Sequence, residues 1–358
     1  MPESPWIRRR VAAVVAALSL SGTLLVPGAV AAEYPAAATA EAAQSGVPTI
    51  TPVAGYPALY EQGVSTGGPD VPGAFALDGG DDVAYYRYKF TPGPRGEIVP
   101  GELLEFAPRH AGSTWLAVSA VDARGIATSA PTYEFNVRLP VTAGRWLFDE
   151  GEGGTAVSEV TGDTLALSSL DLWGPGSNAE LFPDDDFGLV LDEPADSAVS
   201  SGLVVDPTGL FTVSAVVNPD DAGPGRVVSQ GSDFELAVVT SPECPTATAT
   251  CWAFTVATGD GGGSTTTYAD AEPLPGVWNA VTAIRNPYAD EVRMYFCESY
   301  VDTPRQVAQS TVDPLDAGSG APLLVGGSDW SGSVDNVRVL AGAPADTKMV
   351  QWCFGATT

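Results

Sequence analysis

The stretch that decides the fold is WSGSVDNVRVL, Trp330–Leu340, near the end of the chain. After a Gly-Ser turn its apolar residues alternate with polar ones, which is typical of a β-strand with one buried face. This period places Asp335 on the same side as Val337 and Val339, the side expected to face a sandwich core. A buried carboxylate needs donors, and the nearest are backbone amides of the preceding turn. We therefore expect Asp335 to anchor that turn rather than bind a metal or a sugar.

Runs of the same kind fill the chain from residue 141 onward. They are GRWLFDE, TLALSSL, FGLVLDE, FTVSAVVNP, GRVVSQG, FELAVVT, CWAFTVA, VWNAVTAI, EVRMYFC, PLLVGG and GSVDNVRVL. Short alternating runs between Gly, Pro and Asp turns predict strands, and no run has the period of a helix. In FTVSAVV, for example, alternation buries one side of the strand from Phe211 to Val217. Residues 141–358 are therefore expected to form a two-sheet jelly roll.

Several of these runs follow one another in a familiar order. They are Trp146-x-Phe148-Asp149-Glu150-Gly151, FTVSAVVNP, PGVWNAVTAI, VRMYF, LLVGG and GSVDNVRVL. This order resembles the laminin-G-like jelly roll of the concanavalin A-like lectin/glucanase superfamily. The sequence departs from that family at Val216, where the family often has Trp, and at Phe296-Cys297-Glu298, which replaces an Asn-Gly turn. The resemblance implies the fold, and it leaves sugar binding, adhesion and catalysis as alternatives.

A smaller unit of the same class precedes the jelly roll. Its strand-like runs are PTITPV, GAFAL, VAYYRYKF, ELLEFAP, TWLAVSAVD and TYEFNVRL, separated by turns such as DGGDD and PGPRG. The run from Ala120 to Val137 resembles the end of immunoglobulin-like and fibronectin-type domains. The chain is thus predicted to be all-β: a small immunoglobulin-like sandwich, residues 47–140, followed by a larger concanavalin A-like jelly-roll sandwich, residues 141–358.

The four cysteines lie in the second half of the chain. Cys244 and Cys251 bracket a turn between two expected strands, which suits a disulfide across a hairpin, and this leaves Cys297 to pair with Cys353. If the first bridge faces the core, the second ties the C-terminal segment to the outside of the sheet. A zinc site is the alternative, but the sequence has no Cys-x-x-Cys and no histidine nearby. Two disulfides fit an oxidising compartment.

Residues 1–32 are predicted to be a secretory signal peptide, with Arg8 to Arg10 before an apolar run and Ala29-Val30-Ala31 as the cleavage site. Residues 33–46 are expected to be a flexible linker. The chain has 44 acids against 16 bases and a formal net charge of -28. A polyanion is repelled by such a surface, so we expect no nucleic-acid partner and, after removal of the signal, no insertion into a membrane. The expected location is extracellular.

Several catalytic classes are hard to build from this sequence. His110 is the one histidine in the chain, and Ser-His-Asp hydrolases and multi-histidine metal sites need an imidazole beside their partners. Glucanases that share this jelly roll carry Glu-x-Asp on one strand, and the chain contains no Glu-x-Asp. We therefore expect no enzyme of that type. A glycoside hydrolase with unrecognised carboxylates remains an alternative.

Acidic residues around the short strand FGLVL suggest a cation site. The candidate ligands are Asp184, Asp186, Asp192 and Asp196. Calcium takes six to eight oxygens from carboxylates and loop carbonyls, and jelly rolls of this superfamily often bind it on edge loops. The alternative is that these aspartates only cap backbone amides in turns.

Two tryptophans lie beside Gly-rich turns and are candidates for sugar stacking. Trp173 occurs in DLWGPGSN and Trp330 in GGSDWSG, where a flat ring can face the apolar side of a pyranose. Packing in the core or under a loop is the alternative for both. The tryptophans inside expected strands are assigned to the core: Trp115, Trp146, Trp252 and Trp278.

These patterns favour a secreted, non-catalytic binding or adhesion protein that recognises a carbohydrate or an extracellular protein surface, with calcium as a candidate cofactor. A second interpretation is a structural spacer in an extracellular assembly. Glycan binding requires an exposed site with aromatic rings, whereas a spacer requires none.

Overall fold

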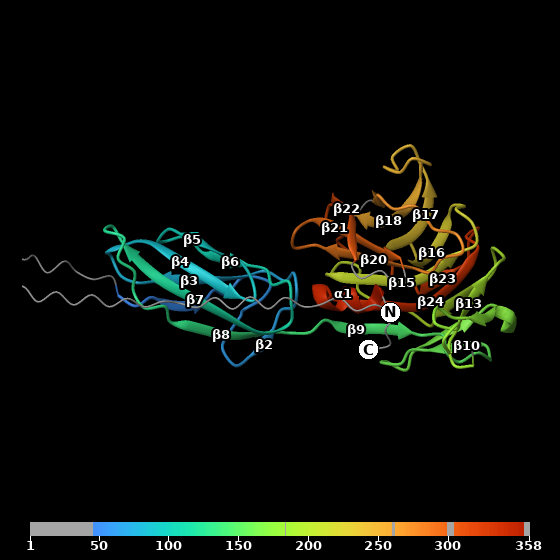
Figure 1. Ribbon diagram of the computed structural model, residues 1–358, viewed down its shortest axis with the longest axis horizontal. Coiled ribbons are helices and arrows are strands. Elements are labelled where there is room, and N and C mark those ends of the chain that lie inside the picture. Colours follow the sequence, from blue (N-terminus) through green and yellow to red (C-terminus); the bar gives the residue numbers. More distant parts are fainter. Residues whose placement is uncertain (1–45, 183, 260–261, 299–303, 354–358) are drawn as a thin grey trace, which may run out of the picture. The chain divides into compact units, whose positions relative to one another are not determined.

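The computed structural model describes residues 46–182, 184–259, 262–298 and 304–353 (Figure 1). This part of the chain consists almost entirely of strands, which confirms the predicted all-β class. The predicted signal peptide, residues 1–32, and residues 33–45 of the predicted linker lie outside the described residues. Among the residues described, none of the helices is long and apolar enough to cross a bilayer.

The first part of the described chain is a small two-sheet sandwich. One sheet has the order β1 (Thr49–Pro52), β3 (Gly73–Asp78), β6 (Leu104–Phe106), and the other has the order β2 (Ser65–Thr66), β8 (Thr132–Val137), β7 (Gly112–Asp122), β4 (Val83–Thr91), β5 (Arg95–Ile98). The sheets enclose a core rich in aromatic rings, in which Phe90 and Phe106 stack with ring centroids 3.8 Å apart. The likeness to immunoglobulin domains and the boundary at residue 140 stay predictions.

The second part is the jelly roll, built from two larger sheets. The β16 sheet has the order β10 (Thr155–Val157), β11 (Thr164–Leu167), β14 (Ser197–Ser200), β23 (Leu323–Gly326), β16 (Gly225–Gln230), β17 (Phe234–Thr240), β18 (Thr250–Thr258), β19 (Gly263–Tyr268). The β24 sheet has the order β12 (Trp173–Pro175), β13 (Phe187–Leu191), β24 (Gly332–Ala341), β15 (Phe211–Pro219), β20 (Asn279–Asn286), β21 (Glu291–Glu298), β22 (Arg305–Thr311), and β9 (Val141–Trp146) also pairs with β24.

Strand β15 shows why the alternating runs form this sandwich. Phe211, Val213 and Val217 point into the core between the two sheets, as predicted. Each methylene removed from water stabilises the folded state by roughly 0.8 kcal/mol. Burial of several side chains on one face of the strand therefore contributes more to stability than any single backbone hydrogen bond. The opposite face of β15 is buried as well, because further elements cover the outside of the β24 sheet.

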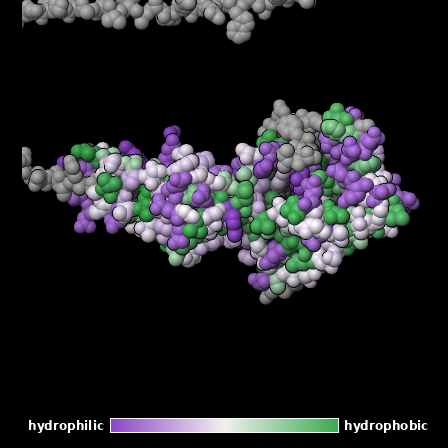
Figure 2. Space-filling view, turned by 90° about the horizontal axis from the view of Figure 1, so that it is seen from below, coloured by the Kyte–Doolittle hydropathy of each residue, from purple (hydrophilic) through white to green (hydrophobic). Residues whose placement is uncertain are grey.

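The face of the molecule drawn in Figure 2 does not mark a binding site by hydropathy alone. On the face that Figure 2 shows, hydrophobic residues are scattered among hydrophilic ones. Isolated exposed apolar residues of this kind are common on soluble proteins. A binding site therefore has to be sought in the cavities.

A short helix is the main departure from the expected strands. The sequence predicted no helix, but α1 (Asp346–Cys353) packs Met349 and Trp352 against Leu210, Ile284 and Leu340 on the outside of the β24 sheet. A helix of this length is too short to be stable in isolation and shows too few turns for a clear 3.6-residue period. Its stability comes from this packing.

A bulge in β24 reverses the predicted direction of Asp335. Ser214 pairs with Arg338 and Val216 pairs with Asp335, so β24 has one residue more than β15 over this interval. Asn336 sits at the bulge with φ 53°. The extra residue changes the side of the sheet on which the residues before it lie. Asp335 therefore lies on the outside of the β24 sheet, and the prediction that it faces the core with Val337 is wrong.

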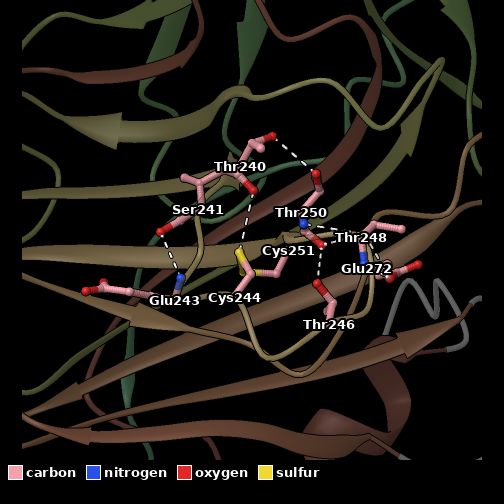
Figure 3. Close-up of a disulfide and its surroundings, with 10 residues drawn as sticks. Thr240, Ser241, Glu243, Cys244, Thr246, Thr248, Thr250, Cys251 and Glu272 are labelled. Atoms are coloured by element: carbon pink, nitrogen blue, oxygen red, sulfur yellow. Dashed lines mark hydrogen bonds between the residues drawn. A yellow bond between two sulfur atoms is a disulfide. The ribbon is translucent and has the colours of Figure 1, made fainter.

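Both predicted disulfides are present. Cys244 pairs with Cys251 and Cys297 pairs with Cys353. Figure 3 shows the first bridge closing the turn between β17 and β18, where the Thr246 hydroxyl donates to the Thr250 carbonyl at 2.8 Å. Because the next residue, Trp252, points into the core, Cys251 faces outward, so the premise that the first bridge faces the core is wrong.

The second bridge ties α1 to the outside of the β24 sheet. Cys297 and Cys353 form a small buried cluster with Val216 and Ala280, separate from the main core. This is the position that the sequence predicted for the Cys297–Cys353 bridge. The segment after the last strand is thereby fixed to the sheet by a covalent bond as well as by packing.

Candidate functional site

A cavity of about 310 Å³ opens at one edge of the jelly roll. It lies between the loop that follows β9 and the paired strands β12, at the edge of the β24 sheet, and β13. Its lining residues are Gly151, Trp173, Gly174, Pro175, Ala179 and Phe187. The two aromatic side chains are half-buried, so each packs on the protein with one part and leaves another part open to the cavity.

Trp173 is positioned by the elements on both sides of it. It follows the 3-10 helix η1 (Leu170–Leu172), whose first turn is capped by the Ser169 hydroxyl accepting from the Asp171 amide at 3.2 Å. In β12 it pairs with Leu189 of β13. Its indole Nε1 donates to the Gly153 carbonyl at 2.8 Å, which fixes the plane of the ring. The ring is thus held in place before any ligand arrives.

Phe187 and Gly151 form the opposite wall of the cavity. Gly151 has φ 66°, a left-handed conformation that favours glycine, and a Cβ at this position would lie 2.7 Å from the Phe187 ring. The loop after β9 can therefore approach the ring closely only with glycine here. Any larger residue would push the loop or the Phe187 ring and change the shape of the cavity.

Three carboxyl groups cluster behind this wall: Asp149, Asp186 and Asp335. Asp186 accepts from the backbone amide and the side-chain amide of Asn178, at 2.6 and 3.3 Å. Asp335, 3% exposed, accepts from the Ser177 amide at 3.0 Å. The anchoring role predicted for Asp335 is confirmed, but its donor belongs to a loop 158 residues earlier in the chain rather than to the preceding turn.

The environment of this cluster favours protonated carboxyl groups. Partial burial, followed by the negative charge of Asp186, raises the pKa of Asp149 to about 6. Burial raises the pKa of Asp335 to about 7, although its hydrogen bonds to Ser177 oppose the shift, and Asp186 and Asp149 add to it. Desolvation and like-charge repulsion thus act in the same direction on both groups.

The four aspartates suggested as calcium ligands lie in different surroundings in the described part of the chain. Asp196 accepts from the amides of Asp192 and Glu193, at 3.1 and 2.9 Å, and so caps its own turn. Asp186 belongs to the cluster with Asp149 and Asp335, and Asp184 is exposed. Within the described ranges, no group of acids, histidines or cysteines is arranged to hold a metal ion. Calcium binding by these aspartates stays a prediction, and we derive no role from that ion.

Trp330 does not offer a stacking surface. Its side chain is 3% exposed and belongs to the jelly-roll core. The Gly-rich turns around it had suggested exposure, but the ring packs among the residues of the main core. By contrast, Trp115, which was assigned to the core, is 39% exposed on β7.

Phe187 and Asp149 are the members of this site that the sequence did not single out. Phe187 begins the run FGLVL and was counted as a strand residue, and Asp149 belongs to the opening run of the jelly roll. The signal that was available is their position: Phe187 begins β13 and Asp149 lies in the turn after β9, and residues at strand ends and in loops often form sites.

Comparison with known proteins supports the fold of the jelly roll. Residues 193–347 match the family model "Concanavalin A-like lectin/glucanases superfamily". This confirms the predicted resemblance, although the cavity at Trp173 and Phe187 lies before the matched segment. No curated protein matches the sequence.

Solved structures with some similarity include carbohydrate-binding domains. One is domain 4 of AbnA, a GH43 extracellular arabinanase from Geobacillus stearothermophilus, in complex with arabinotriose: 12% identity, 60% of this chain and 98% of that chain, TM-score 0.40. Another is the CBM40 of the Ruminococcus gnavus IT-sialidase bound to α2,3 sialyllactose: 10% identity, 46% and 95%, TM-score 0.32. A third is a SAP-like pentraxin from Limulus polyphemus: 12% identity, 40% and 69%, TM-score 0.31. Similarity at this level does not identify a ligand for this chain.

Proposed function

Starting from the membership of residues 193–347 in the concanavalin A-like lectin/glucanase superfamily, we propose that this protein is a secreted, non-catalytic carbohydrate-binding protein. Its sugar site is the cavity at Trp173 and Phe187. The two disulfides fit an extracellular location, since such bridges persist in oxidising compartments.

The observation that carries the proposal is the pair of half-buried rings that line an open cavity. Aromatic faces attract the C–H-rich face of a pyranose, and the fixed plane of Trp173 lowers the entropic cost of stacking. The cavity volume of about 310 Å³ is at the lower end of small-molecule pockets, which suits one sugar ring of a longer chain.

Glycan-array screening followed by calorimetric titration of the best ligand tests this function. Trp173→Ala should weaken binding about tenfold or more, equivalent to about 1.4 kcal/mol, because the stacking face is removed. Trp173→Phe should retain part of the affinity. Trp115→Ala is the matched control, since it removes an exposed tryptophan from the small sandwich, and it should bind like the wild type.

Three results would count against the proposal. If Trp173→Ala bound the glycan as tightly as the wild type, the sugar site would not be at Trp173. Absence of any bound glycan would favour the structural spacer. Release of reducing sugar from a polysaccharide by the purified protein would favour the hydrolase, for which two carboxyl groups about 5 to 9.5 Å apart are required.

A further inference from the structure

A second cavity, of about 270 Å³, lies where β9, β24 and α1 meet. Basic and aromatic residues on its wall are Arg145, Arg338, Lys348 and Trp352. The rest of the wall is largely apolar and includes Pro140, Val160 and Leu340. We call this cavity the cationic groove. The whole chain has 16 lysines and arginines against 44 acids, so three basic side chains around one cavity are a strong local exception.

The two arginines are placed directly opposite each other. Arg145 of β9 and Arg338 of β24 are partners in the antiparallel register. Side chains of directly opposite residues lie close together, and like charges in this position destabilise a sheet. The register therefore places two like charges side by side, and the carboxylates of Glu159 and Asp335 offset part of their repulsion.

Arg145 is only partly neutralised. Its Nη1 lies 3.3 Å from the Glu159 carboxylate, but its Nε and Nη2 are buried and have no hydrogen-bond partner among the described residues. Buried donors on a charged group are costly when they stay unpaired. The side chain thus has two donors available for an acceptor that is not part of the described chain.

Arg338 is a buried cation held against an aromatic ring. Its residue is 4% exposed, and its guanidinium carbon lies 5.3 Å from the centre of the Trp352 ring. Burial, followed by repulsion from Arg145, lowers the pKa of Arg338 to about 9. The group still carries its charge at neutral pH. An anion between the two guanidinium groups would relieve the repulsion that both experience.

We propose that the cationic groove binds the carboxylate group of a small acidic ligand. A planar carboxylate matches the paired donors of guanidinium groups. Lys348, exposed on α1, supplies a further positive charge at the wall. A single negative charge is favoured over a doubly charged phosphate, because the apolar walls penalise desolvation and the net charge of -28 repels anions in proportion to their charge.

This site is separate from the sugar cavity and does not depend on it. The cationic groove is built from β9, β24 and α1, whereas the sugar cavity is built from the loop after β9 and from β12 and β13. The Trp173→Ala variant should bind carboxylates like the wild type. Failure of one proposal is therefore distinguishable from failure of the other.

Calorimetric titration of the full chain with sodium glucuronate and with glucose tests the proposal. Glucuronate should bind and glucose should not compete with it. Arg145→Gln should weaken glucuronate binding at least tenfold. Arg305→Gln is the matched control: it removes one positive charge from an exposed arginine 3.8 Å from Asp270, outside the groove, and it should leave binding unchanged.

Additional ligands distinguish the source of the carboxylate. Equal affinity for acetate and glucuronate would assign the groove to small organic acids, and tighter binding of glucuronate would assign it to acidic sugars. Both results support carboxylate recognition. Tighter binding of inorganic phosphate than of either carboxylate would overturn the assigned chemistry.

Thermal unfolding checks that the variants are folded. Arg145→Gln should melt near the wild-type temperature, because it removes both the like-charge contact with Arg338 and the ion pair with Glu159. If it fails to fold, Lys348→Gln on the exposed face of α1 provides the second variant, and weaker glucuronate binding is expected from it. The proposed site would be overturned if Arg305→Gln and the groove variants lost the same affinity for glucuronate, or if none of them lost any.

Discussion

Asp335 links a single carboxyl group to the pH dependence of stability. Its pKa rises from 3.8 to about 7 on folding, mainly through burial, so the folded state binds more protons than the unfolded state between these values. Stability must then fall as the pH rises through this window. Asp149, whose pKa is raised to about 6, acts in the same direction. We expect a larger free energy of unfolding at pH 5 than at pH 8, measured by denaturant titration.

Two variants of Asp335 separate charge from hydrogen bonding. Asp335→Asn cannot ionise but still offers an oxygen to the Ser177 amide, so it should reduce the loss of stability between pH 5 and pH 8. Asp335→Ala leaves that buried amide without an acceptor and should cost about 1–3 kcal/mol at both pH values. A pH profile of Asp335→Asn parallel to that of the wild type would assign the effect to other groups.

Single residues show which features of the site could be predicted from the sequence and which could not. Trp173 and Trp330 both lie beside Gly-rich turns in the sequence, but Trp173 is half-buried and Trp330 is buried in the core. Burial depends on tertiary packing, which the local sequence does not specify. The cationic groove left a weaker signal in the sequence: Arg145 precedes Trp146, and Arg338 lies between Val337 and Val339. Their position opposite each other depends on strand pairing, which one sequence does not specify.

At the scale of elements, the two disulfides allow a direct comparison. The sequence separation is 56 residues between Cys297 and Cys353 and 7 residues between Cys244 and Cys251. The loop-entropy model gives about 4 kcal/mol for the longer closure and about 2.5 kcal/mol for the shorter one. Replacing both cysteines of the longer bridge by serine should therefore lower the free energy of unfolding more than the same change in the shorter bridge.

The comparison is made by denaturant unfolding of the two double variants under identical conditions. The longer bridge also fixes α1 beside the cationic groove, so its loss should weaken glucuronate binding, whereas loss of the hairpin bridge should not. A larger destabilisation from the hairpin bridge would show that local strain or residual structure outweighs loop entropy in this chain.

Strands were easier to predict than the features that interrupt them. The sequences of β15 and β24 show the alternation of a strand directly, and the pairing of both disulfides was predicted from the strand pattern. The bulge at Asn336 shifts that alternation by one residue, and the local sequence did not predict it. Helix α1 is stable because Trp352 and Met349 meet a surface built by distant strands, and this long-range packing is absent from an eight-residue window.

For the molecule as a whole, the net charge of -28 opposes compaction. Carboxylates that repel one another at short range in the folded state lie farther apart in the unfolded chain, so the repulsion costs stability. The distance over which it acts falls from about 30 Å at 0.01 M ionic strength to about 8 Å at 0.15 M. We therefore expect the melting temperature to rise with salt over this range and to change less beyond it.

The choice of salt decides whether screening is the cause. Sodium chloride and choline chloride at equal ionic strength should raise the melting temperature equally, because screening depends on charge and concentration rather than on cation identity. Sulfate is avoided, since it strengthens apolar burial by exclusion from the protein surface. A rise with calcium chloride that exceeds the rise at matched ionic strength would instead show preferential binding of calcium to the folded state, because a ligand stabilises the state that binds it.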